Sequence, residues 1–194
     1  SSKESLPSRS FPKHVCETSA AEPNRSQERA GTPSHGVVRE PDASLQDDGV
    51  SLYVHLPFCV SKCRYCDFNS YAWTGQDLES YVEALLVEAR HRTTELRPQT
   101  VFIGGGTPTF LPADLLCHLL DELHAITGFR DSALEVTIEA NPESFDDARA
   151  EAARDGGVQR ASVGVQSLRP EVLQAYDRVH SGAQALEALA RARE

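Results

Sequence analysis

Methionine is absent from this chain of 194 residues, even at position 1. We therefore expect the chain to be a piece of a longer protein. Basic residues are scarce: 19 Lys and Arg stand against 29 Asp and Glu, which gives a formal net charge of −10. A surface that binds phosphate backbones normally carries a basic excess, so nucleic acid is not the expected main partner.

Long apolar runs are also missing. No stretch approaches the roughly 18–20 apolar residues that a membrane-spanning helix requires. The N-terminal part lacks the apolar segment of a secretory signal, and acidic residues such as Glu17 and Glu28 do not fit a transit peptide. The cytosol is therefore the expected compartment, and no membrane span is expected.

The N-terminal part, residues 1–49, has few apolar residues and is rich in Ser, Pro, Glu and Arg. Too little apolar surface is available there to offset the entropy lost on ordering. We expect 1–49 to be a disordered tail and 50–194 to be the ordered domain. Cys16 stands alone in the tail and is given no role.

The ordered part alternates strand-like and helix-like patterns four times. Strands are expected at residues 51–56, 100–103, 134–140 and 160–165. Helical spacing or helix-start signals follow at 78–89, from 112, after 144 and from 170, and an alanine-rich helix is expected at 183–194. The third helix is expected to start at a capping box formed by Ser144 and Asp147.

This alternation predicts an α/β fold with a parallel sheet, because each parallel pair of strands needs a crossover helix. The pattern leaves an incomplete (β/α) barrel and an open doubly wound sheet as alternatives. Each expected strand runs into a polar or glycine-rich loop, and α/β proteins place ligands at that end of their strands.

Three of the five cysteines, Cys59, Cys63 and Cys66, have the spacing C-x3-C-x2-C. In a cytosolic chain such clustering more often indicates metal or redox chemistry than a disulfide framework. Three thiolates can hold three irons of a cubane cluster and leave the fourth iron open for a small ligand. The spacing also permits a zinc site completed by His55, or a redox or structural set of thiols.

The residues around these cysteines resemble the radical S-adenosylmethionine (SAM) family. Residues 52–59 read LYVHLPFC and residues 63–70 read CRYCDFNS. Three motifs follow in the family's order, GGGTPT at 104–109, IEANP at 138–142 and GVQS at 164–167. The resemblance covers about residues 51–194. It is closest to the branch that contains oxygen-independent coproporphyrinogen III oxidase and the haem chaperone HemW, and it implies a truncated, TIM-like (β/α) barrel.

The resemblance also implies a site. Cys59, Cys63 and Cys66 would bind a [4Fe-4S] cluster, and the open iron would be chelated by SAM. One-electron cleavage of SAM would then give methionine and a 5′-deoxyadenosyl radical. The resemblance places around SAM and the cluster loop Tyr53, Tyr65, Gly105, Gly106, Thr107, Glu139, Gln166 and Arg178.

Several of these residues have a plainer interpretation from the sequence alone. Tyr53, on an alternating strand, is equally well placed in a core. Glu139 is compatible with a local pair, and Gln166 with a buried, hydrogen-bonded amide. Arg178 is by default a surface residue at a helix end. The glycine run at 104–106 lacks the G-K-[ST] of a phosphate-binding loop.

Phe68 separates two functions within the branch. The oxidase typically carries a further cysteine two residues after the third cluster cysteine, and here that place is Phe68. The resemblance therefore implies a protein that binds haem and passes it to acceptor proteins, with cluster and SAM in a supporting or regulatory role. The alternatives are oxidative decarboxylation of coproporphyrinogen III, another SAM-radical reaction on a small molecule, and a non-catalytic, truncated cluster-binding module.

Overall fold

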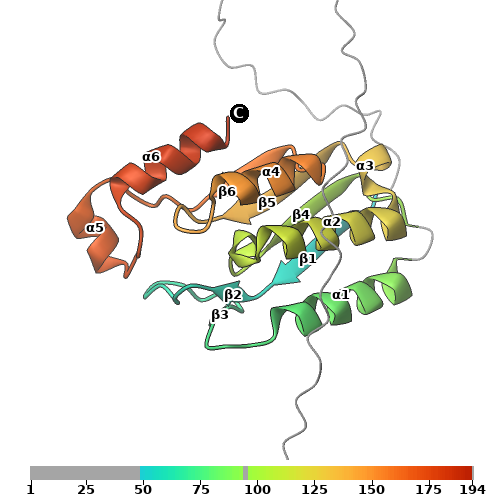
Figure 1. Ribbon diagram of the computed structural model, residues 1–194, viewed down its shortest axis with the longest axis horizontal. Helices are drawn as coiled ribbons and strands as arrows, with labels where there is room; N and C mark the ends of the chain where they lie inside the picture. Colours follow the sequence, from blue (N-terminus) through green and yellow to red (C-terminus); the bar gives the residue numbers. More distant parts are fainter. Residues whose placement is uncertain (1–48, 94–95, 194) are drawn as a thin grey trace, which may run out of the picture.

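The computed structural model describes residues 49–93 and 96–193. The tail expected at 1–49 therefore lies, apart from Gly49, outside the described residues, and so does Cys16. The described part contains a parallel sheet with helices packed against one of its faces (Figure 1).

The sheet contains four strands in the order in which they occur along the chain. They are β1 (Ser51–Leu56), β4 (Thr100–Gly105), β5 (Glu135–Ala140) and β6 (Arg160–Val163). All three pairings are parallel, and Ile103 lies in register with Val54 on one side and Ile138 on the other. A doubly wound sheet would reverse its strand order and carry helices on both faces. The predicted partial (β/α) barrel is therefore confirmed.

The helices follow the strands as the alternation predicts. They are α1 (Leu78–Arg92), the 3-10 helix η1 (Pro108–Phe110), α2 (Ala113–Thr127), the short α3 (Phe129–Ser132), α4 (Asp147–Asp155), α5 (Pro170–Ala175) and α6 (Gly182–Arg191). The core lies between the sheet and α1, α2 and α4. Ile103, Leu116 and Leu120 are fully buried in it. Burial of such side chains from water is the main force that fixes these helices on the sheet.

The predicted capping box at Ser144 is wrong. Helix α4 begins at Asp147, and its N-cap is Asp146, whose carboxylate accepts a hydrogen bond from the Arg149 backbone N–H. The Ser144 hydroxyl is buried and lies 2.7 Å from the Thr109 hydroxyl, so it fixes η1 to the loop after β5. A capping box does occur at the start of α6, outside the segment where we expected it.

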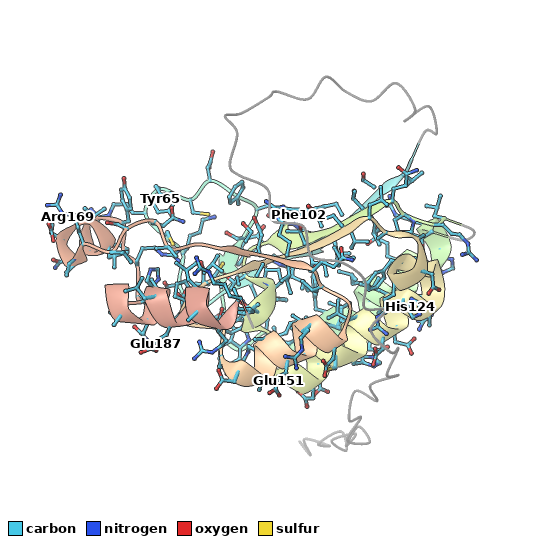
Figure 2. All side chains as sticks on the ribbon, turned by 90° about the horizontal axis from the view of Figure 1, so that it is seen from above. Tyr65, Phe102, His124, Glu151, Arg169 and Glu187 are labelled. Carbon is cyan, nitrogen blue, oxygen red and sulfur yellow. The ribbon has the colours of Figure 1, made fainter. Side chains whose placement is uncertain are left out.

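The other face of the sheet is not covered by any helix of the described residues (Figure 2). Tyr53 of β1 and Phe102 of β4 stack there, with ring centroids 6.1 Å apart. Tyr53 is 56% exposed, so its interpretation as a core residue is wrong. This open face leads to the C-terminal ends of the strands.

Candidate functional site

The clustered cysteines lie in a loop that is closed by short backbone pairings. Strand β2 (Phe58–Cys59) pairs in parallel with β3 (Tyr71–Ala72). Inside the loop, Lys62 Nζ donates hydrogen bonds of 3.0 Å to the carbonyl oxygens of Phe68 and Ser70. Strands of two residues are too short to produce an alternating pattern, which is why the sequence did not predict them.

A pocket of about 280 Å³ opens where this loop meets the ends of β4, β5 and β6. Parallel strands in sequence order bring their C-terminal ends to one edge, and this explains why distant motifs meet there. The predicted site residues that line the pocket are Cys59, Cys63, Tyr65, Cys66, Gly105, Gly106, Glu139, Gln166 and Arg178.

A chain of hydrogen bonds links two of the cysteines through the loops after β4 and β5 and the segment after α5. The Thr107 hydroxyl donates to Cys59 Sγ at 3.4 Å and accepts from Asn141 Nδ2 at 2.8 Å. Asn141 Oδ1 in turn accepts from Arg178 Nη2 at 2.6 Å, and Arg178 Nη1 donates to Cys63 Sγ at 3.1 Å. The positions of the two thiols are therefore tied to each other by the protein itself.

Thr107 and Tyr53 are absent from the pocket lining. Thr107 is buried behind Cys59, where it supports the thiol. The Tyr53 hydroxyl lies 2.9 Å from His55 Nδ1, and burial followed by the Glu139 carboxylate raises the pKa of this phenol. His55 Nε2 donates to the carbonyl oxygen of Asn69, so Tyr53 reaches the cysteine loop through His55. Direct contact of either residue with a cofactor stays a prediction.

The environment of the Cys59 thiol, including the other two cysteines, affects its titration. Burial raises the pKa of the Cys59 thiol, and the neighbouring Cys66 and Cys63 raise it further, while hydrogen bonds with Thr107 and Ser70 act in the opposite direction. Since iron binds thiolates, loading a metal here releases protons. The three thiols line one pocket and each has a hydrogen-bonding neighbour, so together they form a set of donors suited to a metal group.

His55 does not complete a zinc site with these cysteines. Both of its ring nitrogens are hydrogen-bonded elsewhere, to Tyr53 and to Asn69, and the ring is not part of the pocket lining. Within residues 49–93 and 96–193, no three His, Cys, Asp or Glu side chains converge as ligands of a single metal ion. A cubane cluster requires a different arrangement, in which each thiolate binds its own iron. The cysteines therefore fit a cluster better than zinc.

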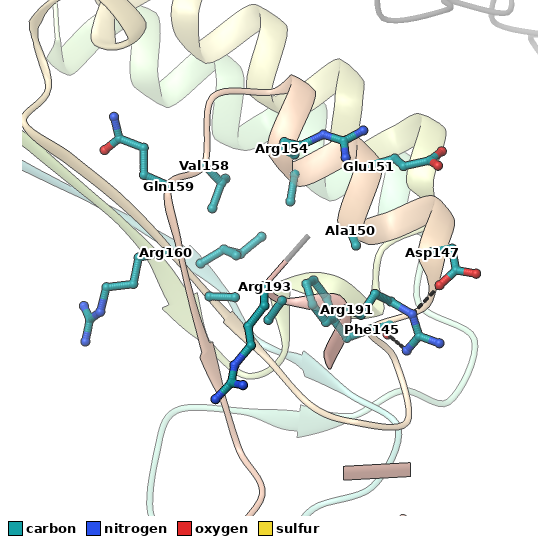
Figure 3. A pocket seen from close by; sticks show the side chains of 14 residues that line it. Phe145, Asp147, Ala150, Glu151, Arg154, Val158, Gln159, Arg160, Arg191 and Arg193 are labelled. Carbon is teal, nitrogen blue, oxygen red and sulfur yellow. Dashed lines mark hydrogen bonds and ion pairs between the residues drawn. The ribbon is translucent and has the colours of Figure 1, made fainter. Parts of the chain in front are cut away.

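A larger hollow of about 420 Å³ lies between α4, β6 and the end of α6 (Figure 3). Its floor is apolar and includes Ile138 and Phe145. Arg191, at its rim, is paired with Asp147 and with the Phe145 carbonyl oxygen. None of the predicted site residues lines it, so size alone does not make it the functional site.

The family model of the radical SAM superfamily matches residues 53–194. The chain belongs to this superfamily. It is 36% identical over 148 residues to the haem chaperone HemW of Haemophilus influenzae and 39% identical over 143 residues to that of Escherichia coli, in each case over 72% of this chain and 38% of the relative. It is 36% identical over 170 residues, 86% of this chain and 38% of the relative, to mitochondrial radical S-adenosyl methionine domain-containing protein 1 of Mus musculus.

Among solved structures, coproporphyrinogen III oxidase (HemN) from Escherichia coli matches with a TM-score of 0.68 at 31% identity. That match covers 75% of this chain and 34% of HemN. The chain thus spans little more than a third of the proteins that it resembles. Membership of the radical SAM superfamily implies a [4Fe-4S] cluster and SAM.

The glycines of the pocket have reasons within the chain to be glycine. Gly105 has a φ of +112°, and a Cβ there would lie 2.5 Å from the His55 ring. A Cβ on Gly106 would lie 2.5 Å from the backbone carbon of Pro57. Gly106 therefore brings β4 against the backbone just before Cys59. Both glycines are therefore required by close packing within the chain itself.

Glu139 connects β5 to the glycine-rich end of β4. Its Oε2 accepts a hydrogen bond of 2.9 Å from the Gly105 backbone N–H. This contact joins two strands across 34 residues of sequence, so it is a tertiary contact and not the local pair considered from the sequence. Glu139 also lines the pocket. The second carboxylate oxygen has no hydrogen bond within the described part of the chain, so Glu139 can receive a donor from a ligand while it holds Gly105.

Arg178 is a buried cation in the pocket wall, which corrects its interpretation as a surface residue. Its side chain is only 5% exposed. Besides Cys63 and Asn141, it donates to the Gly164 carbonyl oxygen at 2.7 Å. Its Nε is buried and has no partner among the described residues. An unpaired buried donor is costly, and a buried guanidinium in a pocket wall favours an anionic ligand group such as a carboxylate.

Gln166 has a φ of +61°, a conformation that costs energy for a residue with a Cβ. Its side chain is exposed in the pocket wall and makes no hydrogen bond within residues 49–93 and 96–193. The interpretation as a buried, hydrogen-bonded amide is therefore wrong. Because Gln166 is strained and its amide is free at the pocket, we expect it to contact a ligand.

Two supporting groups were not selected from the sequence. Asn141 directly follows β5 and lines the pocket, so the same strand-end rule that selected Glu139 would have found it. His180 is buried, its Nε2 donates to the Val165 carbonyl oxygen at 3.1 Å, and its Nδ1 lies 3.2 Å from Glu143 Oε2. The His180–Glu143 pair lies next to Arg178. No local sequence pattern predicts this pair.

Within the described ranges, none of the helices combines the length and the apolar character needed to cross a membrane.

Proposed function

We propose that Cys59, Cys63 and Cys66 hold a [4Fe-4S] cluster in this pocket and that SAM binds beside it. A bound cluster supplies single-electron chemistry to SAM. The positive charge of Arg178 would attract the SAM carboxylate, and Glu139 and Gln166 would offer polar contacts. The observation that carries this proposal is the meeting of three thiols and a buried, partly unsatisfied guanidinium in one pocket.

For the intact protein we propose the function of a haem chaperone of the HemW type, which binds haem and passes it to acceptor proteins. Phe68 supports this choice over the oxidase. It lines the pocket two residues after Cys66 and is 70% exposed. A phenyl ring cannot ligate a metal, donate a proton or be oxidised as a thiol can. The relatives named HemW, at 36% and 39% identity, are consistent with the same choice.

The second candidate is oxidative decarboxylation of coproporphyrinogen III, favoured by the structural match to HemN. A third is a cluster-binding module without catalysis. The cytosolic compartment expected from the sequence is also part of the proposal, although the mouse relative, aligned over 86% of this chain, is named as mitochondrial.

The test uses the intact protein, reconstituted anaerobically with iron and sulfide. One sample receives SAM, a reductant and coproporphyrinogen III, and protoporphyrinogen is followed. A second is titrated with haem and then mixed with a haem-free acceptor protein. We expect saturable haem binding and transfer, and no porphyrinogen turnover. Turnover would overturn the chaperone proposal in favour of the oxidase, and absence of both activities would favour the non-catalytic module. Cys63→Ser is the control that removes the cluster.

A further inference from the structure

Three successive residues of the cysteine loop face three successive residues after α5 in antiparallel order. The inner pair is a hydrogen bond of 3.1 Å, the middle pair is an ion pair with two hydrogen bonds of 3.0 and 3.4 Å, and the outer pair is an edge-to-face ring contact with centroids 5.0 Å apart. We call these pairs the clasp. They are Cys63 with Arg178, Arg64 with Asp177, and Tyr65 with Tyr176.

The clasp joins two walls of the pocket. Cys63 and Tyr65 line the pocket from the loop, and Arg178 lines it from the opposite wall. Arg64 and Asp177 do not line it, although each lies directly beside residues that do. The ion pair is therefore placed to fix the pocket-lining groups without touching a ligand.

The backbone conformation of Asp177 indicates that its carboxylate has a specific role in the contact with Arg64. Asp177 has a φ of +54° at the end of α5, where the chain turns back so that the Arg178 N–H donates to the Leu173 carbonyl oxygen at 2.9 Å. Glycine, and to a lesser degree asparagine, is the usual residue at such a left-handed helix end. Aspartate tolerates this conformation less well than glycine, and what it gains here is the forked contact with the Arg64 guanidinium.

We propose that Arg64 and Asp177 are positioning residues that hold the cysteine loop against Arg178 and thereby set the geometry in which SAM is bound. The proposal rests on the proposed SAM site. The two side chains are 73% and 49% exposed, so the pair is screened by salt and opens easily. The clasp thus combines an inner contact made by the buried Arg178 side chain with a middle ion pair that responds to ionic strength.

The experiment compares the intact wild-type protein with Arg64→Gln, Asp177→Asn, the double variant and Arg64→Lys. Asparagine keeps a residue that tolerates positive φ and removes only the charge. Asp177→Gly removes both the charge and the backbone strain, so its comparison with Asp177→Asn separates the effect of strain from that of charge. The matched control is Arg92→Gln, which breaks the comparably exposed Arg92–Glu88 ion pair on α1. Hydrogen exchange of residues 60–70 and 174–180 is measured without the cluster, and SAM affinity is measured with it.

In low salt, each single variant should exchange about two- to fivefold faster in both segments, as expected for an exposed ion pair. SAM affinity should fall by a similar factor, the double variant should be no worse than either single one, and Arg64→Lys should recover part of the loss. Asp177→Gly should exchange faster in spite of its relaxed backbone. In high salt, the wild type should approach the variants.

Unchanged exchange in the single variants, or independent effects that add in the double variant, would overturn the clasp. So would faster exchange with unchanged SAM affinity. A wild-type protein that holds its cluster and binds no SAM would instead refute the proposed SAM site, and in that case the exchange data alone decide whether the clasp exists.

Discussion

Arg178 donates through Nη1 to the Sγ of Cys63 across 3.1 Å, although 115 residues separate the two in the sequence. This contact joins the segment after α5 to the cysteine loop, so one guanidinium contacts both a proposed cluster ligand and the proposed SAM site. Because the Arg178 side chain is almost fully buried, its hydrogen bonds are not shared with bulk water.

We predict that Arg178→Lys weakens SAM binding by about tenfold or more, because a charge-assisted hydrogen bond contributes roughly 1.5–3 kcal/mol and lysine lacks the forked donors of arginine. Equilibrium binding of SAM to the cluster-loaded protein measures the change. Arg191→Lys is the matched control, since Arg191 belongs to the larger hollow. Equal losses in both variants would mean that the effect is not specific to this pocket.

For Glu139 we predict a graded effect. Glu139→Ala removes the acceptor of the Gly105 N–H and the negative charge, and SAM affinity should fall by about tenfold. Glu139→Gln keeps an acceptor for Gly105, so its affinity should lie between those of the wild type and the alanine variant. Iron content should stay unchanged in both, because Glu139 does not ligate iron in the proposed site. An alanine variant that binds SAM as tightly as the wild type would remove Glu139 from the site.

A pH-dependent contribution to stability is expected at the start of α1. Asp77 is its N-cap, and hydrogen bonds from the Ser80 side chain and backbone lower the pKa of this carboxyl below its ordinary value of 3.8. A lowered pKa in the folded protein stabilises it above the unfolded pKa, and this stabilisation is lost as the pH falls through the folded pKa.

The stability difference between the wild type and Asp77→Asn should therefore be present near pH 7 and shrink as the pH approaches 3. Denaturant unfolding at several pH values measures it. Asp114→Asn is the control, because Asp114 lies in the first turn of α2 without acting as its N-cap. A difference that stays constant with pH would contradict the assigned role of the Asp77 charge.

The sequence predicted those parts of the site that depend on strand order. Gly105, Glu139 and Gln166 each lie at or just after a strand end, and parallel strands in sequence order must bring such ends together. The capping box at Ser144 failed because a tertiary partner, Thr109, takes up the hydroxyl that the local pattern assigned to a helix.

Pairings between distant segments could not be predicted from the sequence. Nothing near Arg64 indicates Asp177, and nothing near Arg178 indicates that its side chain is buried against a thiol. Tyr53 alternates as a core residue would, but it lies on the face of the sheet that no described helix covers. Such residues are placed by contacts between segments far apart in the sequence, and period-based patterns do not contain that information.

The central claim is that the three cysteines of the loop hold an iron–sulfur cluster. Iron, sulfide and zinc are measured in the anaerobically reconstituted wild type, in Cys63→Ser and in Cys117→Ser, whose thiol is buried in the core away from the pocket. We predict about four irons and four sulfides per chain in the wild type and in Cys117→Ser, and a large loss of both in Cys63→Ser. Zinc without sulfide in the wild type, or an unchanged cluster content in Cys63→Ser, would contradict the claim.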